Sequence, residues 1–222
     1  MECFCLIAVC VCSHLVRVLI KVVKLLGSLV PLEPRLAKKL TEPLTDIITT
    51  TPAKSLLYEA VNTLLCGELR SKTVVKLCLE KLRHFIEDAD QNLKYLGLLG
   101  LHKLLQKQPR VVAEHKDLIL ACLADDDVTI RMRALDLITS MVSLKNLAPI
   151  VGKLLQHLQV AELGAASYRE HVLSRILFIC AQDGFAYVQD FEWSDTRQGS
   201  DSGHADLRFT RLLTRLHLCG CC

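Results

Sequence analysis

Two clusters of acidic residues are the first positions in this chain that could bind a metal ion. Segment 88–92 begins like a calcium-binding loop, with side-chain oxygens at alternate positions, but such a loop needs a glycine at position 93 and a bidentate acid at position 99. The chain has leucine at both positions, and the three aspartates at 125–127 likewise precede an apolar stretch. We therefore expect Asp90 and Asp127 to be helix N-caps that accept hydrogen bonds from free backbone amides.

The eleven cysteines are concentrated at the two ends of the chain. Near the start, Cys3, Cys5, Cys10 and Cys12 lie close to His14. They could bind zinc, carry reversible acyl groups or simply belong to an apolar end; zinc ligands are usually two to four residues apart in loops, so we favour the last reading. Cys219, Cys221 and Cys222 lack the two aliphatic residues of a prenylation signal. The central cysteines should pack as small hydrophobes, and the odd total suits a reducing compartment; these four are Cys66, Cys78, Cys122 and Cys180.

No arrangement of residues typical of catalysis is recognisable. The sequence contains no nucleophile elbow, no phosphate-binding Walker loop and no dinucleotide fingerprint. Five of the histidines fall in helical stretches without a neighbouring nucleophile: His84, His102, His115, His157 and His171. We expect a protein that is not an enzyme and that uses no metal and no cofactor.

Basic residues gather between positions 15 and 40, where Glu33 is the only acid. Such a run is most often a solvated helix face, but it could also contact an acidic protein or an anionic membrane. No aromatic residues alternate with the bases, and the net charge is only +3, so nucleic acid is not an expected partner. The candidate anionic-surface residues are Arg17, Lys21, Lys24, Arg35, Lys38 and Lys39.

Composition favours an all-α fold. Hydrophobic residues make up 51% of the 222 residues and aromatic residues only 5%, so the core should be aliphatic, as in helix-on-helix packing. The apolar start, 3–16, follows Glu2 without a basic residue or a cleavage site, which argues against export. It is also too short to cross a bilayer before the first bases. We expect a soluble chain.

A repeat of 37 residues indicates how these elements pack. Leu56, Leu93 and Ile130 are in register at this period, and each is followed four residues later by a small residue, then by further aliphatics. A small residue lets a second helix approach closely, and this period is typical of stacked helix pairs of the HEAT or armadillo type. The small residues are Ala60, Gly97 and Ala134. A fourth, less regular unit begins near Tyr168.

The pattern predicts an α-solenoid without strands. We expect helices at 15–30, 34–50 with a restart at Pro43, 53–65, 73–87, 91–106, 111–123, 128–142, 148–160 and 168–181. The apolar side of the first helix comprises Leu15, Val18, Leu19, Val22, Leu25, Leu26 and Leu29. The segment after Ser194 is rich in glycine and serine and should be disordered. The expected parts are therefore an apolar Cys-rich extension (1–14), a solenoid (15–193) and a disordered tail (194–222).

Three stretches resemble the trunk of the adaptin large subunits. These are Ser-Leu-Leu-Tyr-Glu-Ala-Val-Asn-Thr at 55–63, Asp-Gln-Asn-Leu-Lys-Tyr-Leu-Gly-Leu at 90–98 and Ile-Arg-Met-Arg-Ala-Leu-Asp-Leu at 130–137. Segments 15–48 and 168–193 are most similar to the delta-type large subunit of adaptor complex three. The likeness covers about 15–193, whereas a full large subunit is several times longer.

The resemblance implies a scaffold of a vesicle coat. Its expected role would be sorting of cargo from the Golgi and endosomes to lysosomes and related organelles, in the cytoplasm and peripherally on membranes. The expected partners are a small sigma subunit, a beta subunit with its medium subunit, and an Arf-type GTPase. Two alternatives remain: a HEAT-repeat scaffold of another class, such as nuclear transport or phosphatase assembly, and a non-functional truncated product.

Overall fold

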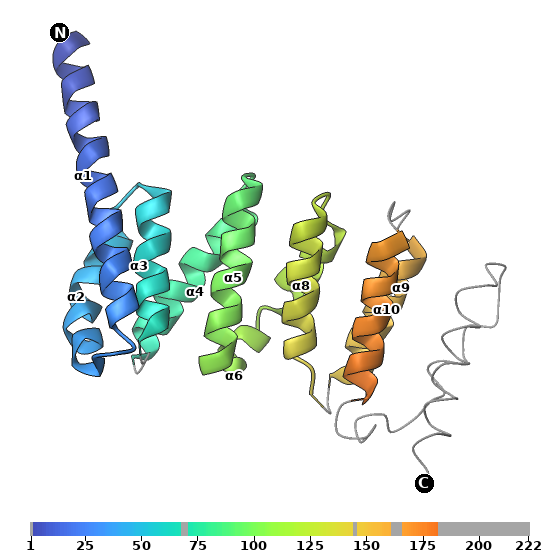
Figure 1. Cartoon of the computed structure of the whole chain (residues 1–222). Helices are drawn as coiled ribbons and strands as arrows, with labels where there is room; N and C mark the ends of the chain where they lie inside the picture. The colour runs from blue at the N-terminus through green and yellow to red at the C-terminus, as the bar shows by residue number, and fades with distance from the viewer. Residues whose placement is uncertain (1, 68–70, 144–145, 161–165, 182–222) are drawn as a thin grey trace, which may run out of the picture. The chain divides into compact units, whose positions relative to one another are not determined.

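The described part of the chain is a series of helices (Figure 1). The computed structural model describes residues 2–67, 71–143, 146–160 and 166–181, and in the first helix it describes side chains from residue 14 onward. The helices are α1 (Glu2–Leu29), α2 (Pro34–Thr50), α3 (Lys54–Cys66), α4 (Lys72–Glu87), α5 (Gln91–Lys107), α6 (Pro109–Ala113), α7 (Lys116–Ala121), the 3₁₀ turn η1 (Cys122–Ala124), α8 (Val128–Ser140), α9 (Leu147–Val160) and α10 (Ala166–Ala181). None of the described residues forms a strand, which confirms the all-α expectation.

The chain divides into two compact units, Met1–Glu114 and His115–Cys222. In the first unit, α3 packs between α1 and α5, while α2 packs on α3 and α4 packs on α5. The short helix α6 follows on α5. This is the arrangement of stacked helix pairs that the 37-residue repeat predicts, because each pair buries its aliphatic face against the next.

The small residue of the repeat allows a close approach between helices in the first unit. A Cβ atom placed at Gly97 of α5 would lie 2.8 Å from Ile86 Cγ1, 3.0 Å from the Leu82 carbonyl oxygen and 3.1 Å from Phe85 Cβ, all on α4. Ala60 and Ala134, its equivalents in the repeat, have no exposed surface. Leu56, Leu93 and Ile130 are also buried, as their register requires.

The second unit is built around α8 and α10. α8 packs against α7, η1 and α10, and α9 packs on α10. Val172, Ile176 and Ile179 of α10 are completely buried. On the surface, the Lys153 ammonium of α9 lies 3.3 Å from a carboxylate oxygen of Asp117 of α7. This unit therefore continues the same aliphatic pairing of helices.

Both expected acidic N-caps are confirmed. The Asp90 carboxylate accepts a hydrogen bond from the Asn92 backbone amide at 2.9 Å, and Asp127 accepts one from Thr129 at 2.7 Å. The Thr129 hydroxyl donates a second hydrogen bond to Asp127 at 2.8 Å, and this bond, followed by that of the Thr129 amide, lowers the pKa of Asp127. The carboxylates thus satisfy amides that the first helical turn leaves free.

Three helix boundaries differ from expectation. α1 begins at Glu2 rather than at residue 15, because the intervening segment contains no proline or glycine that would end a helix. α2 continues through Pro43, which is exposed, so water can reach the carbonyl that lacks its amide partner. The helix expected at 111–123 is divided into α6, α7 and η1. The break between α6 and α7 lies where the backbone of His115 (φ −103°, ψ 20°) leaves the helical region.

Some expectations fall outside the described residues. These are the disordered tail at 194–222 with its terminal cysteines, and the part of the adaptin-like segment between 182 and 193. The side chains of Cys3, Cys5, Cys10 and Cys12 also lie outside the described ones, so their expected apolar role stays a prediction. No helix among the described residues is long and apolar enough to span a membrane.

We predict that Gly97→Ala destabilises the first unit. Overpacking against α4 costs about 1–3 kcal/mol, and the better helix propensity of alanine returns about 0.5–1 kcal/mol, so the net loss is up to about 2.5 kcal/mol. Gly152→Ala in α9 is the matched control, because a Cβ there meets nothing within 4 Å. This control should gain about 0.5–1 kcal/mol. Urea denaturation of both variants measures the effect, and equal shifts of the same sign would contradict the close α4–α5 contact.

Candidate interaction surface

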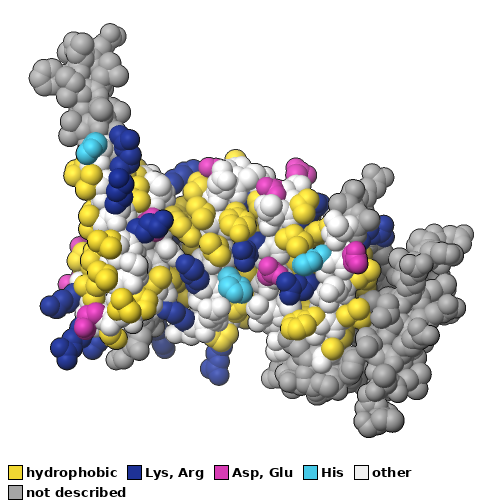
Figure 2. Space-filling model, in the orientation of Figure 1, with side chains coloured by type: hydrophobic (Ala, Val, Ile, Leu, Met, Phe, Trp, Pro, Cys, Tyr) yellow, Lys and Arg dark blue, Asp and Glu magenta, His cyan; other side chains and the backbone are white. Residues whose placement is uncertain are grey.

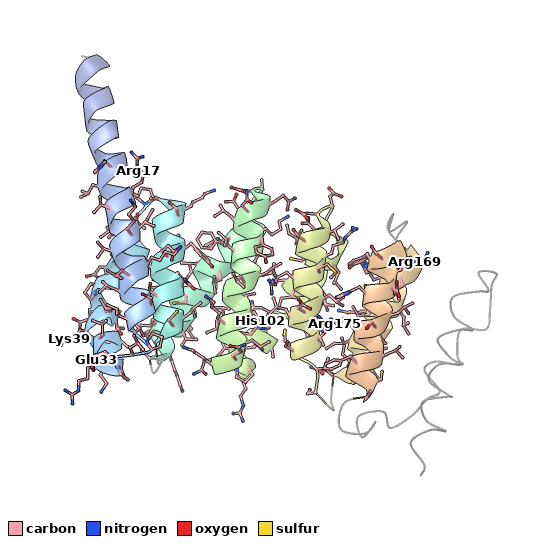
Figure 3. The ribbon with its side chains drawn as sticks, in the orientation of Figure 1. Arg17, Glu33, Lys39, His102, Arg169 and Arg175 are labelled. Atoms are coloured by element: carbon pink, nitrogen blue, oxygen red, sulfur yellow. The ribbon has the colours of Figure 1, made fainter. Side chains whose placement is uncertain are left out.

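The six basic residues singled out in the sequence lie in two separate groups. Arg17, Lys21 and Lys24 are on α1, and the other three, Arg35, Lys38 and Lys39, are on α2. All six are exposed. Figure 3 shows Arg17 and Lys39 towards opposite ends of the first unit, with Glu33 near Lys39. The first unit therefore presents two basic regions rather than one continuous patch.

One side of α1 is held firmly against α3. Val23 and Val30 are buried on this side, and the Thr63 hydroxyl of α3 donates a hydrogen bond to the Val23 carbonyl oxygen at 3.1 Å. A Cβ atom placed at Gly27 would lie 2.8 Å from Thr63 Oγ1, so glycine permits this close approach. α1 is thus anchored by one face only.

A second apolar face of α1 is exposed. Its members follow a spacing of three and four residues along the helix, and between 40% and 65% of each side chain is exposed; they are Leu15, Val18, Val22, Leu25 and Leu29. We call this set the α1 stripe. The sequence analysis assigned all seven apolar residues of this helix to one side, whereas the structure separates the stripe from Leu19 and Leu26, which are half-buried. The regular spacing of the stripe is visible in the sequence, but only the structure shows that it has no covering element among the described residues.

The basic group on α2 borders a cavity in the first unit. The cavity has a volume of about 600 Å³ and lies between α2, α3 and α4. Buried aliphatic side chains, Val30, Leu44, Leu64 and Val74, form part of its wall, and Arg35, Lys38 and Lys39 also line it. Glu42 lies on the same lining and partly offsets this positive charge. The sequence revealed the three bases but not the hollow beside them.

A polar cluster around the buried Tyr168 joins helices of the second unit. The Arg131 guanidinium of α8 lies 4.7 Å from the centre of the Tyr168 ring of α10. His157 of α9 meets the same tyrosine edge to face, with 3.3 Å between its Nε2 atom and the hydroxyl oxygen. About two turns further along α10, Arg175 forms an ion pair with Asp136 of α8 at 2.8 Å. Burial, followed by the charge of Arg131, lowers the pKa of His157.

The other candidate side chains that the structure describes do not assemble into a reactive site. Within the described residues, no three histidine, cysteine or acidic side chains come close enough to hold a metal ion. Burial raises the pKa of Cys78 to about 12 and that of Cys180 to about 11, so these thiols are poor nucleophiles. The described side chains thus offer exposed surfaces for binding and no evident centre for covalent chemistry.

Comparison with known proteins gives one family match. Residues 14–194 match the family described as "Adaptin N terminal region". The match covers both units and ends close to the expected end of the solenoid.

Individual relatives point to one type of large subunit. The chain is 51% identical to "AP-3 complex subunit delta-1" of Bos taurus over 183 residues, covering 79% of this chain and 15% of that relative. It is 47% identical to "AP-3 complex subunit delta" of Dictyostelium discoideum over 200 residues, covering 88% of this chain and 17% of that relative. The chain therefore spans less than a fifth of the length of these two relatives.

A structural comparison agrees with the sequence match. The fold is similar, with a TM-score of 0.61 and 25% identity, to a chain of a homology model of the full-length AP-3 complex in an intermediate open conformation. The similarity covers 92% of this chain and 37% of that chain. The expected fold class, an α-solenoid of HEAT-like helical hairpins, is thereby confirmed.

We predict that the second unit loses stability as the pH falls below about 6.5, the ordinary value for histidine. The pKa of His157 is lower in the folded chain, so in this pH range the unfolded chain binds more protons and is favoured. His157→Gln should make the unfolding free energy less dependent on pH between neutrality and mild acid. His14→Gln, on an exposed position of α1, is the control and should keep the original dependence. Denaturant titrations at a series of pH values provide the measurement, and identical pH profiles for the two variants would contradict the role of His157.

Proposed function

The chain belongs to the adaptin family, and we propose that it is a scaffold segment of a vesicle-coat adaptor complex in intracellular protein transport. Its proposed role is sorting of cargo from the Golgi and endosomes towards lysosomes and related organelles. The similarity to the delta subunits of AP-3 complexes from Bos taurus and Dictyostelium discoideum supports this assignment. Because the chain spans only 15% and 17% of the length of these relatives, the role of the whole subunit is a proposal for this chain.

The observation that carries the proposal is the repeated pairing of helices within the matched residues. Stacked pairs place their aliphatic faces inside and leave polar edges exposed along each unit, which suits simultaneous contacts with several proteins. Polar contacts also tie neighbouring helices together: Lys103 of α5 and Asn62 of α3 lie 2.6 Å apart, and Arg175 of α10 forms an ion pair with Asp136 of α8. We propose a binding scaffold without enzymatic activity.

The proposed partners follow from the same assignment. They are a small sigma subunit, a beta subunit together with a medium subunit, and an Arf-type GTPase that recruits the complex. The chain would act in the cytoplasm and associate peripherally with Golgi and endosomal membranes, and the two basic groups on α1 and α2 are the proposed contacts with an anionic surface.

Two other functions were compatible with the sequence. One is a HEAT-repeat scaffold in nuclear transport or phosphatase assembly, and the other is a truncated product without a partner. The names of the relatives favour the coat scaffold over the first alternative. The second alternative, a truncated product, predicts that the chain does not fold or captures no adaptor subunit. Measuring folding and capture therefore distinguishes it from the proposed scaffold.

We predict that the full chain, co-expressed with the sigma and beta subunits of an AP-3 complex, co-purifies with at least one of them. A bound partner should raise the melting temperature, since a ligand at a hundredfold its Kd stabilises the folded state by about 2.7 kcal/mol. Affinity capture and circular dichroism melting measure both effects.

The controls separate loss of fold from loss of binding. Val172→Asp places a charge at a completely buried position of α10 and should abolish both the cooperative melt of the second unit and any capture that depends on it. A phosphatase catalytic subunit and a nuclear-transport cargo, used as bait, test the other scaffold class. A wild-type chain that melts cooperatively yet captures neither adaptor subunit would refute the proposed role for this segment.

A further inference from the structure

The turn between α2 and α3 carries a short sequence with a specific chemical meaning. It reads Thr51-Pro52-Ala53-Lys54, a hydroxyl residue followed by proline, with a basic residue three positions after the hydroxyl. Proline-directed protein kinases modify a serine or threonine directly before a proline, and the cyclin-dependent class also favours a base at that third position. Of the six prolines in the chain, only Pro52 follows a serine or threonine, so this arrangement occurs once in the sequence.

We propose that Thr51 is a phosphorylation site for a proline-directed kinase that recognises Lys54. The kinase transfers the γ-phosphoryl group of ATP to Oγ1 of Thr51. An O–P bond forms there, the bond from the γ-phosphorus to the β–γ bridging oxygen breaks, ADP leaves, and the hydroxyl proton passes to the base of the kinase. The inference concerns modification of the chain and does not depend on the proposed role in a vesicle coat.

The backbone of the turn already has the conformation in which a kinase binds its acceptor, which is extended. Thr51 is extended (φ −80°, ψ 130°), and so is Ala53 (φ −77°, ψ 102°). Pro52 enforces this at Thr51, because the proline ring disfavours the helical region for the residue before it. Residues 51–53 accordingly belong to neither helix.

The turn lies on the surface of the first unit. Thr49, Thr50, Pro52 and Lys54 are exposed, and Thr51 is half-buried. Figure 1 shows this turn and the α4–α5 turn at the same end of the unit. Turns between helix pairs lie along the edge of a stack and not between its layers, so this exposure does not depend on whether other helices precede α1.

The two helix ends beside the turn are weakly held, so a kinase can engage the flanking residues. α3 begins without a side-chain cap, because its N-cap residue is Ala53. At the end of α2, the hydroxyls of Thr49 and Thr50 donate hydrogen bonds back to the carbonyl oxygen of Asp46 at 3.0 Å and 2.7 Å. Such bonds compete with the backbone ladder of the helix. The ends can therefore open locally while the core stays folded.

The direction of the hydroxyl decides what the phosphate meets. The Ala53 amide donates a hydrogen bond to Thr51 Oγ1 at 3.3 Å, so the hydroxyl turns towards the start of α3. The first turn of α3 contains no acidic residue, and a negative group is favourable at a helix N-terminus. The Cα atom of Lys54 lies within about 11 Å of that of Thr51, a span that a lysine side chain and a phosphate can bridge together.

Lys54 has another partner in the unmodified chain. Its ammonium lies 2.5 Å from a carboxylate oxygen of Asp88, at the α4–α5 turn. Asp88 also accepts a hydrogen bond from the Asp90 amide at 3.1 Å, so it keeps one bond when the lysine leaves. A phosphate carries nearly two negative charges against one for the carboxylate. Phosphorylation should therefore move Lys54 from Asp88 to Thr51 and release a link between the two turns.

The test is phosphorylation of the purified full chain by a cyclin-dependent kinase with radiolabelled ATP. We expect a single phosphate, on the tryptic peptide 40–54, which mass-spectrometric fragmentation should place at Thr51. Thr51→Ala and Pro52→Ala should remove the label. Thr50→Ala, the matched control one residue earlier, should keep it. Circular dichroism melts show that each variant retains the fold.

Recognition of Lys54 needs its own comparison. Lys54→Ala should lower kcat/KM of the kinase at least about tenfold, because a charge-assisted contact is lost, and Lys54→Arg should restore most of the rate. Figure 2 shows other lysine and arginine side chains distributed over the described surface, so a base elsewhere is the control. Lys76→Ala removes an exposed base on α4 and should leave the rate unchanged.

The move of Lys54 is measured at Asp88. In the unmodified chain, the hydrogen bond from Lys54 is the main cause that lowers the pKa of Asp88. Phosphorylation should therefore raise this pKa towards its ordinary value, as followed by NMR of the carboxyl carbon. Asp127, whose pKa is lowered by Thr129, is the control and should not change.

Several results would overturn the proposal. Label that persists in Thr51→Ala would place the site elsewhere. A synthetic peptide 46–59 that is phosphorylated while the folded chain stays unmodified would show that the native turn is closed to the kinase. Equal rates for wild type and Lys54→Ala would remove the recognition of Lys54, and an unchanged pKa of Asp88 after phosphorylation would contradict its release.

Discussion

The close contact between paired helices is the constraint on which the first unit depends. At Gly97 the backbone of α5 approaches α4 so closely that even a methyl group would press on Ile86 and on the Leu82 carbonyl oxygen. Gly27 performs the same function where α1 meets Thr63 of α3. With the helices this close, long aliphatic side chains can fill the space between them at the density of a protein interior. The core consequently needs few aromatic residues.

This way of packing also determines what is left exposed. A helix in a stacked array must bury one face in each neighbour, so a helix with only one packed face retains apolar surface. α3 has neighbours on two sides, whereas α1 packs against α3 and carries the exposed stripe on another sector. Some polar contacts lie at helix ends, such as those of Lys107 with the carbonyl oxygens of Leu65 and Gly67. The surfaces available for binding are therefore consequences of the core.

Patterns in the sequence were sufficient for most of the helices, the buried register and the acidic caps, but not for the division of 111–123 into α6, α7 and η1. Asp90 and Asp127 could be identified because an N-cap depends on neighbouring residues only. The division of α1 into a buried face and an exposed stripe could not be predicted from the sequence. The apolar residues of this helix cover more than half of its circumference, and their pattern does not indicate which part contacts α3. The cluster of Arg131, His157 and Tyr168 was also missed. Its members come from three helices, and nothing in their separate sequence contexts indicates that they meet.

The central claim is that each unit has an interior made by stacked aliphatic helix faces, and native-state hydrogen exchange tests it most directly. The account predicts that the slowest amides in the first unit lie in α3 and α5 around Leu64 and Leu101, and that those in the second unit lie in α8 and α10 around Ile138 and Ile176. Exposed ends of the helices should exchange much faster. Rapid exchange throughout these four helices, comparable with that of an unfolded peptide, would contradict the account.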